Sequence, residues 1–558
     1  MPDRGSDPPP PAEPGPVETT GRWIGPTDRP LLSWLTTPAG RTGSVGVVIV
    51  PPFGYELWSS HRTLRTLAER LAGQGCSVVR FDLDGTGDSG GDQWDPDRLP
   101  TWRHDVGIAA ASLRALDVSS LVLVGLRMGA TLALLEGPAT AADAVVAWAP
   151  IVQGRRYVRE LQLLGVPVPE TPTTAGRGGG IVQAGSVFSV DLLGALGGLD
   201  LSTLTSSPAE RVLVVDREDK PRSSPLLDRL TALGSHPDHL VLPGTDLAID
   251  RPSEYATVPV DIVEQISHWV GPGHAVDRAV EPRRDATIRW AMTSVSEEVV
   301  RLGPSGLAGI VTRAGGVERA TVVWLNSGSE HHVGPGRAWV EYARDLALAG
   351  YSSLRVDFTG WGESPDSGHA PGRPYDQHGV EEVGEIVAAL RAGGHRRVVL
   401  AGLCAGAWMA LRAALVVELD GVVAINPQLY WRPGDPVEAD IVGETRARRQ
   451  SEIRRIKRLR RTGLWWGLDV LGVRHPAATW LRRLSRTGTP VMCLFTEGDD
   501  GLEFLEDRTA RAWAQVRRHG AVDLVVVGEI DHPMHRHWYR SKVVSAIHDW
   551  LDTRFAEG

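Results

Sequence analysis

The sequence repeats itself once, about halfway along its 558 residues. VVIVPPFG at 47–54 corresponds to VVWLNSGS at 322–329, and VVRFDLDGTGDS at 78–89 to SLRVDFTGWGES at 353–364. Three more blocks follow in the same order, and the offset is 275 residues from Val47 to Val322 and 277 from Gly125 to Gly402. A nearly constant offset predicts two copies of one domain, in a chain too long for a single core.

Within each copy, short β-branched runs alternate with longer stretches rich in alanine and leucine. RTLRTLAERLAGQG at 62–75 and RAWVEYARDLALAG at 337–350 are typical of helices, and each precedes an apolar run. Buried strands that alternate with helices predict an α/β fold, with a mostly parallel sheet covered on both faces. We expect a disordered Pro-rich leader at 1–21, a first domain at 22–270, a polar linker at 271–286 and a second domain at 287–558.

The third recurring block ends a predicted strand, turns and begins a helix. It reads LVLVGLRMGATLALL at 121–135 and VVLAGLCAGAWMALR at 398–412. A nucleophile between small residues at such a turn forms a nucleophile elbow, and Cys404 has this place between Gly402 and Gly406. The positive end of the following helix favours a thiolate, and the N–H of Ala405 would face an oxyanion. The alternative is a small buried cysteine that fills a crowded turn.

Two polar residues follow later apolar runs of the second copy. Asp499 ends MCLFTEGD, and His532 ends VVVGEIDH. A cysteine nucleophile needs a base, and the base needs an orienting carboxylate. The order nucleophile, acid, histidine is the chain order of the α/β-hydrolases. Asp500 is an alternative to the adjacent Asp499, and His535 and His537 are alternatives to His532, which alone follows the predicted strand directly.

Both copies resemble α/β-hydrolase domains. FDLDGTGDSGG is similar to the family's post-strand loop, and NSGSEHHVGP lies where the family builds the other half of its oxyanion hole. PPFGYE, GLRMGA, GLCAGA and NPQLYW resemble small bacterial hydrolases found with exopolysaccharide and exosortase systems. A cysteine in the elbow is similar to dienelactone hydrolases and polyhydroxyalkanoate synthases.

The resemblance implies a role for each site residue of the second copy. Cys404 is the nucleophile, His532 the general base and Asp499 the orienting acid. The N–H groups of Ala405 and Ser327 are the oxyanion donors. In the same loop, His331 and His332 are expected at the surface rather than in a catalytic role, the alternative being that they reach the cleft.

The first copy lacks two of these groups. Aligned on the repeat, it has Arg127 for Cys404, Asp219 for Asp499 and Leu247 for His532. Arginine stays protonated and cannot act as a nucleophile, and leucine cannot accept a proton. We therefore predict a degenerate, pseudoenzyme domain. Arg127 is expected to pair with a nearby acid, the alternative being a site for a carboxylate or phosphate.

The segment at 430–487 corresponds to the cap, where this fold usually selects its substrate. It contains ETRARRQSEIRRIKRLRRTGLWWGL, with an apolar stripe at Ile453, Ile456 and Leu459. The other positions are mostly basic. They form either a solvated face or a lid that attracts an anionic phosphopantetheine arm, carrier protein or glycan. The candidate substrate-binding residues are Arg454, Arg455, Arg458 and Arg461.

Composition excludes several classes of protein. A net charge of -9 gives no reason to expect a nucleic-acid partner. No apolar run approaches the roughly 18 residues of a membrane span, and the N-terminus has no apolar signal core. Three cysteines without a Cys/His metal spacing predict neither a disulfide framework nor a zinc site. We expect a cytoplasmic protein without metal or cofactor.

Together these features predict an acyl-transfer enzyme with one active site per chain. The first hypothesis is a hydrolase that cleaves an ester or thioester of a small or carrier-bound acyl group through an acyl-enzyme. The second is an acyltransferase that uses an acyl-CoA or acyl-carrier-protein donor. The third is a non-catalytic binding or scaffold protein in which both sites are inert.

Overall fold

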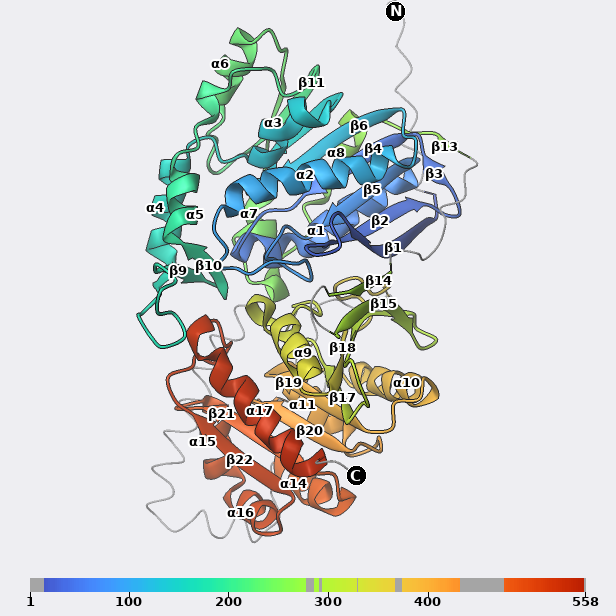
Figure 1. Cartoon of the computed structure of the whole chain (residues 1–558), viewed down its shortest axis with the longest axis vertical. Coiled ribbons are helices and arrows are strands. Elements are labelled where there is room, and N and C mark those ends of the chain that lie inside the picture. Colours follow the sequence, from blue (N-terminus) through green and yellow to red (C-terminus); the bar gives the residue numbers. More distant parts are fainter. Residues whose placement is uncertain are drawn as a thin grey trace, which may run out of the picture.

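The structure is a computed structural model of the whole chain (Figure 1). It describes residues 15–276, 286–290, 294–328, 330–366, 374–431 and 476–555. Two large sheets follow one another along the chain, one in each half. In Figure 1 the first half, coloured blue to green, lies above the second half, coloured yellow to red.

The first half is built on a sheet of eight strands in the order β1-β2-β5-β4-β6-β7-β11-β12. Its strands are β1 (Val17–Ile24), β2 (Leu31–Pro38), β4 (Val45–Val50), β5 (Cys76–Phe81), β6 (Ser120–Leu126), β7 (Ala144–Trp148), β11 (Arg211–Arg217) and β12 (Asp238–Leu242). Short strands outside it are β3 (Thr42–Gly43), β8 (Val166–Pro167), β9 (Gly180–Gln183), β10 (Ser186–Ser189) and β13 (Ala275–Val276). The helices are α1 (Tyr55–Gly73), α2 (Arg98–Arg114), α3 (Met128–Thr140), α4 (Gly154–Leu164), α5 (Val190–Gly197), η1 (Leu201–Thr203), α6 (Ser224–Ala232), α7 (Thr245–Ile249), η2 (Ser253–Tyr255) and α8 (Val260–Val270).

The second half repeats this plan with nine strands in the order β14-β15-β16-β18-β17-β19-β20-β21-β22. They are β14 (Thr287–Arg289), β15 (Ser296–Leu302), β16 (Leu307–Arg313), β17 (Ala320–Trp324), β18 (Tyr351–Val356), β19 (Val398–Leu403), β20 (Gly421–Ile425), β21 (Val491–Thr496) and β22 (Val522–Val527). Its described helices are η3 (Pro335–Arg337), α9 (Ala338–Leu348), α10 (His378–Ala392), α11 (Ala405–Ala413), α14 (Pro476–Thr487), α15 (Asp500–Arg508), α16 (Ala510–Arg518), η4 (His537–Tyr539) and α17 (Arg540–Phe555).

The predicted fold class is confirmed. From β5 onward in the first sheet, and from β18 onward in the second, neighbouring strands are parallel, and the strands before them are antiparallel. Helices cover both faces: α2 and α3 pack on one face of the first sheet, and α1 and α8 on the other. In the second half, α10 and α11 cover one face, and α9 and α17 the other. These layers place the carboxyl ends of the parallel strands at one edge, where α/β folds build their sites.

Two expected boundaries differ in the structure. β1 begins at Val17 and pairs with β2 along its length, so the last residues assigned to the leader belong to the sheet. The segment expected to be a linker, 271–286, contains β13, which pairs with β3 of the first half. Within the described residues, no helix is long and apolar enough to cross a membrane.

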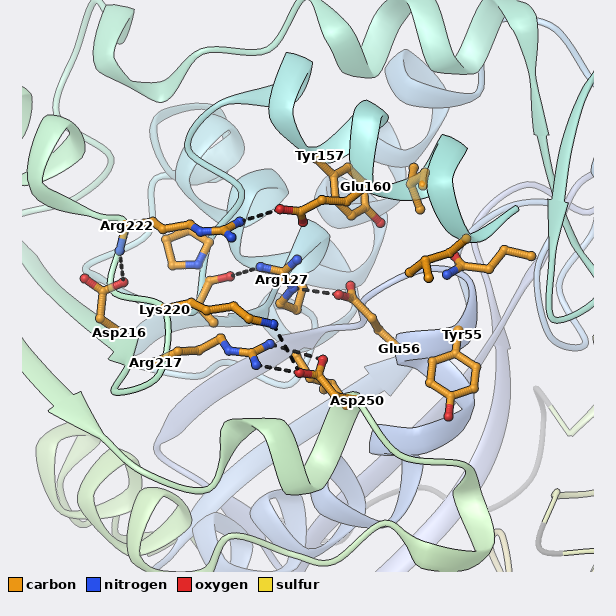
Figure 2. Close-up of a pocket in the computed structure, with 16 residues that line it drawn as sticks. Tyr55, Glu56, Arg127, Tyr157, Glu160, Asp216, Arg217, Lys220, Arg222 and Asp250 are labelled. Carbon is orange, nitrogen blue, oxygen red and sulfur yellow. Dashed lines mark hydrogen bonds and ion pairs between the residues drawn. The ribbon is translucent and has the colours of Figure 1, made fainter. Parts of the chain in front are cut away.

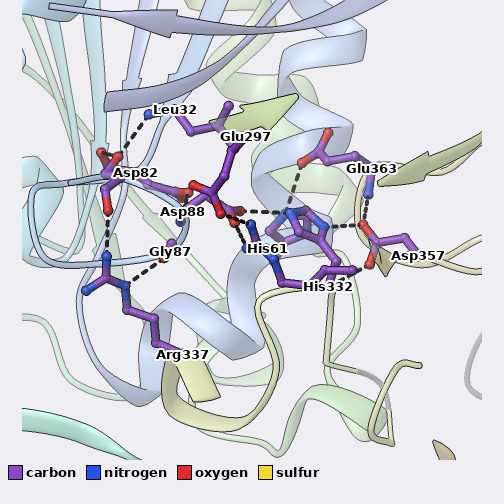
Figure 3. A network of polar contacts seen from close by, with 12 residues as sticks. Leu32, His61, Asp82, Gly87, Asp88, Glu297, His332, Arg337, Asp357 and Glu363 are labelled. Carbon is purple, nitrogen blue, oxygen red and sulfur yellow. Dashed lines mark hydrogen bonds and ion pairs between the residues drawn. The ribbon is translucent and has the colours of Figure 1, made fainter. Parts of the chain in front are cut away.

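The two halves meet through matching loops that follow β5 and β18 (Figure 3). Arg80 of β5 donates two hydrogen bonds of 2.7 Å to Glu363 after β18. Arg355 of β18 pairs with Asp88 after β5. Since Arg80 and Arg355 are equivalent positions of the repeat, as are Asp88 and Glu363, the same ion pair is made twice across the interface. This reciprocity is the mark of an isologous, twofold contact.

Apolar side chains from both halves fill the space beside these ion pairs. Trp23, Leu32 and Trp34 of the first half pack with Ile310 of the second. Gly21 of β1 lies so close to the second half that a Cβ would meet Val299 Cγ1 at 2.6 Å. The halves therefore share a small apolar cluster at this interface, separate from the main cores of the two sheets.

Candidate active site

The turn between β19 and α11 holds Cys404 in the conformation of a nucleophile elbow. Its φ and ψ are 55° and -107°, a region that costs about 1–3 kcal/mol for a residue with a side chain. A Cβ on Gly402 would lie 2.5 Å from the backbone of Gly406, and one on Gly406 would lie 2.6 Å from the carbonyl oxygen of Asn326. Only glycine fits at either position. Cys404 is partly exposed, whereas Cys76 and Cys493 are buried.

His532 and Asp499 lie together at the ends of neighbouring strands. His532 Nδ1 is 2.5 Å from Asp499 Oδ2, and Asp499 Oδ1 accepts a 2.8 Å hydrogen bond from the N–H of Gly501. Asp499 thus caps α15 and orients the imidazole at the same time. Of the alternatives to these two residues, Asp500 is the first residue of α15, and His537 contacts Glu341 at 3.2 Å. The structure thus brings Asp499 and His532 together, the two residues that the sequence analysis expected to form the acid–histidine pair.

The electrostatics of His532 favour its charged form. Burial lowers the pKa of His532, but hydrogen bonds and charge interactions with Asp499 and Cys404 outweigh it and raise the pKa to about 10. At neutral pH His532 is therefore an imidazolium, next to a sulfur atom that becomes a good nucleophile when it carries a negative charge.

Two polar side chains that the sequence analysis did not single out complete this site. The Tyr375 hydroxyl lies 3.5 Å from Cys404 Sγ and donates a 3.1 Å hydrogen bond to Gln428 Oε1. Gln428 Nε2 lies 3.4 Å from His532 Nε2. Trp431 stacks on Tyr375 with ring centroids 5.0 Å apart and donates to Gln428. Gln428 and Trp431 belong to NPQLYW, which directly follows β20, and this position could have identified them as site residues. Tyr375 precedes α10 in an irregular segment, and no sequence signal marks it as a site residue.

The expected oxyanion donors lie at the two loops beside the elbow. Ala405 is the first residue of α11, so its N–H has no acceptor within the helix. Ser327 is buried in the loop after β17. The preceding Asn326 fixes this loop, because its side chain donates to Asp357 at 3.0 Å and accepts from the N–H of Phe358 at 2.9 Å.

The expectation that His331 and His332 lie at the surface is wrong. Both are buried, and His332 contacts Asp357 of its own half at 2.6 Å and Asp88 of the first half at 2.8 Å (Figure 3). The partner that buries this imidazole lies 244 residues away in the sequence. The four candidate arginines of the cap, Arg454, Arg455, Arg458 and Arg461, lie outside the described residues.

The first half keeps the turn and replaces the reactive groups (Figure 2). Arg127 has φ and ψ of 55° and -113°, close to the values at Cys404. Its Nε donates a 2.7 Å hydrogen bond to Glu56, as expected for pairing with a nearby acid. Pro52 stands where the second half has Ser327 and has no N–H to donate, so the first half has no counterpart of this expected oxyanion donor.

Strand register identifies the positions that match the acid and the histidine. In the first half Ala147 pairs with Val214, and in the second half Ala424 pairs with Cys493. Lys220 lies six residues after Val214, and Asp499 lies six residues after Cys493. Asp219 therefore lies one residue before the matching position and pairs with Arg217 at 2.7 Å. Counted likewise from the last paired residue of β12 and of β22, Leu247 matches His532.

Two family models match this chain, one in each half. Residues 322–555 match the model of the Alpha/beta hydrolase family, and residues 56–179 that of Serine aminopeptidase, S33. Similar solved structures include brefeldin A esterase, a bacterial homologue of human hormone sensitive lipase (19% identity, 48% of this chain and 80% of that chain, TM-score 0.33). Others are an α/β serine hydrolase without lid from Xanthomonas campestris (19%, 46% and 96%, 0.31) and dienelactone hydrolase from Anabaena variabilis (12%, 47% and 98%, 0.31). No curated protein sequence matches the chain.

Proposed function

We propose that this protein, an enzyme of the esterase-type α/β-hydrolase class, cleaves acyl thioesters through an acyl intermediate on Cys404. The observations that carry the proposal are the 2.5 Å contact between His532 and Asp499 and the raised pKa of His532, to which both Asp499 and Cys404 contribute. Such a histidine holds a proton at neutral pH and can deliver it to a leaving group.

The reaction follows from these groups in two steps. The Cys404 thiolate attacks the acyl carbonyl, and the carbonyl oxygen becomes an oxyanion that the N–H groups of Ala405 and Ser327 stabilise. When the intermediate collapses, the bond to the leaving sulfur breaks, and His532 gives it a proton. The now neutral His532 removes a proton from water, whose oxygen attacks the acyl-Cys404 carbonyl. The acid is released, and the thiolate and the imidazolium are restored.

The sulfur nucleophile supports a thioester rather than an alkyl ester as the substrate. In an intermediate that carries two sulfur substituents, either thiolate can leave with similar ease. An alkyl ester would instead have to expel an alkoxide, which is far more basic than the thiolate of Cys404. Attack on an ester would then reverse more often than it proceeds, unless His532 protonates the alkoxide as it leaves.

The experiment is intact-protein mass spectrometry after brief mixing with acetyl and octanoyl thioesters of coenzyme A. We expect one acyl adduct per chain, at Cys404, and none in Cys404→Ala. Adding an alcohol or amine acceptor and weighing the products separates hydrolysis from the second candidate, acyl transfer. Absence of any adduct and any turnover would favour an inert scaffold and reject the proposal.

A further inference from the structure

The first half holds a cavity at the place that corresponds to the active site of the second half. Its volume is about 400 Å³, at the lower end of the range of about 300–1,000 Å³ for small-molecule sites. Figure 2 shows Arg127 near its centre, with Tyr157 and Glu160 of α4 above it and Asp250 below. Tyr157, which also lines the cavity, comes from α4.

Fixed charges of both signs line this cavity in equal number. The lining contains four basic and four acidic side chains, so the cavity as a whole carries no net charge. The basic groups are already neutralised by close carboxylates: Arg127 by Glu56 at 2.7 Å, Arg222 by Glu160 at 2.7 Å and Arg217 by Asp250 at 2.5 Å. An anion would lie against these carboxylates, and a cation against the guanidinium groups. The cavity therefore suits an uncharged ligand.

Some polar atoms of the lining have unused hydrogen-bonding capacity. Glu56 Oε2 is buried and accepts no hydrogen bond from the described part of the chain, although Oε1 binds Arg127. Burial raises the pKa of Tyr157 well above its ordinary value, so its hydroxyl keeps its proton and can donate. A buried carboxylate oxygen without a donor is destabilising, and a ligand hydroxyl would supply the missing donor.

The strained turn at Arg127 supports a binding role for this cavity. The positive φ of this turn is strained for a residue with a side chain, and in the second half the same turn presents the proposed nucleophile. The first half keeps this conformation without a nucleophile, a matching histidine or the second oxyanion donor. What remains for the turn to do is to hold the Arg127 guanidinium in the cavity, over the Tyr157 ring at 5.8 Å.

We propose that this cavity binds a neutral polyhydroxylated molecule, a sugar or polyol of about one or two rings. A hydroxyl group both donates and accepts, so neighbouring hydroxyls can bind the free oxygen of Glu56 and the guanidinium of Arg127 together. Tyr55 and Tyr157 supply aromatic surface against which the C–H faces of such a ligand pack.

The test is calorimetric titration of the whole protein with glucose, N-acetylglucosamine, maltose and sucrose, and with phosphate and glycine as charged probes. At least one sugar is expected to bind with Kd below about 1 mM, and neither charged probe is expected to bind. Tyr157→Phe should weaken sugar binding about threefold to tenfold, and Glu56→Gln about tenfold or more.

Matched variants separate this proposal from the chemistry of the second half. Tyr255→Phe changes a tyrosine outside the cavity and should leave sugar binding unchanged. Cys404→Ala should also bind sugar normally, and Tyr157→Phe should still be acylated at Cys404, so this proposal and the proposed function can fail separately. The proposal is overturned if no sugar binds up to about 10 mM, if a charged probe binds instead, or if correctly folded Tyr157→Phe and Glu56→Gln both bind sugar as the unaltered protein does.

Discussion

Replacing Arg355 by methionine is expected to destabilise the whole molecule through the interface between its halves. Arg355 is fully buried and pairs with two carboxylates that are also buried, Asp88 of the first half and Glu297 of the second. Methionine keeps most of the apolar stem but removes the positive charge. Asp88 then keeps His332 as a partner at 2.8 Å, and Glu297 keeps Arg344 at 2.7 Å.

The expected loss follows from what the two carboxylates retain. Removing one member of a buried ion pair costs about 3–5 kcal/mol, because a charge is left in a medium that solvates it poorly. Since both carboxylates keep a second partner, we expect the free energy of unfolding to fall by the lower end of this range, about 3 kcal/mol. Burial raises the pKa of Asp88, but Arg355 and His332 outweigh it and hold the pKa below its ordinary value. The stability that Asp88 contributes is therefore present above about pH 4 and is lost as the pH falls.

The measurement is urea-induced unfolding at pH 7, followed by tryptophan fluorescence. Arg313→Met is the matched control, because Arg313 on the adjacent strand β16 pairs with Glu298 at 2.9 Å while both side chains are exposed, by 46% and 37%. Arg313→Met should lower the free energy of unfolding by no more than about 1 kcal/mol. If Arg355→Met and Arg313→Met unfold at the same urea concentration, the buried cluster does not hold the halves together and this reasoning is wrong.

Three further predictions concern the second half. Because the pKa of His532 is about 10, kcat/KM for an alkyl thioester should fall as the pH rises through about 10 and the imidazolium loses its proton, whereas an ester with a nitrophenol leaving group should not show this fall. Iodoacetamide at pH 7 should label Cys404 first, because burial raises the pKa of Cys76 to about 11 and that of Cys493 to about 12; peptide mapping that finds either buried thiol labelled as fast would contradict this. Neutralising the four cap arginines should raise KM for anionic acyl donors and spare neutral ones, with an effect that shrinks as salt is added; equal losses on both donors would assign these arginines to a solvated surface.

Much of the architecture could be predicted because it depends on local patterns. The repeated strand–turn–helix blocks contain their own signals, since the small residues around Cys404 are required by the turn itself. The order of Cys404, Asp499 and His532 could also be used, because each follows a strand whose carboxyl end reaches the same edge of the sheet.

Contacts between distant segments could not be predicted in this way. His332 lies in a polar sequence that is typical of an exposed loop, but packing against Asp357 and, from the other half, Asp88 buries it. Tyr375 reaches Cys404 from an irregular segment without periodicity. The leader boundary was placed too late because prolines precede β1, whereas pairing with β2 orders the chain from Val17.

The interface connects the first half to the candidate active site of the second half. Asp88 of the first half contacts His332, which contacts Asp357, and Asp357 in turn accepts a hydrogen bond from Asn326 beside Ser327. The loop expected to supply an oxyanion donor is thus fixed partly from outside its own domain. In an isologous pair of equal domains, each half would support the loop of the other in this way. Here the contact is reciprocal although only the second half has a cysteine at the elbow, so the first half can support this loop whether or not it has reactive groups of its own.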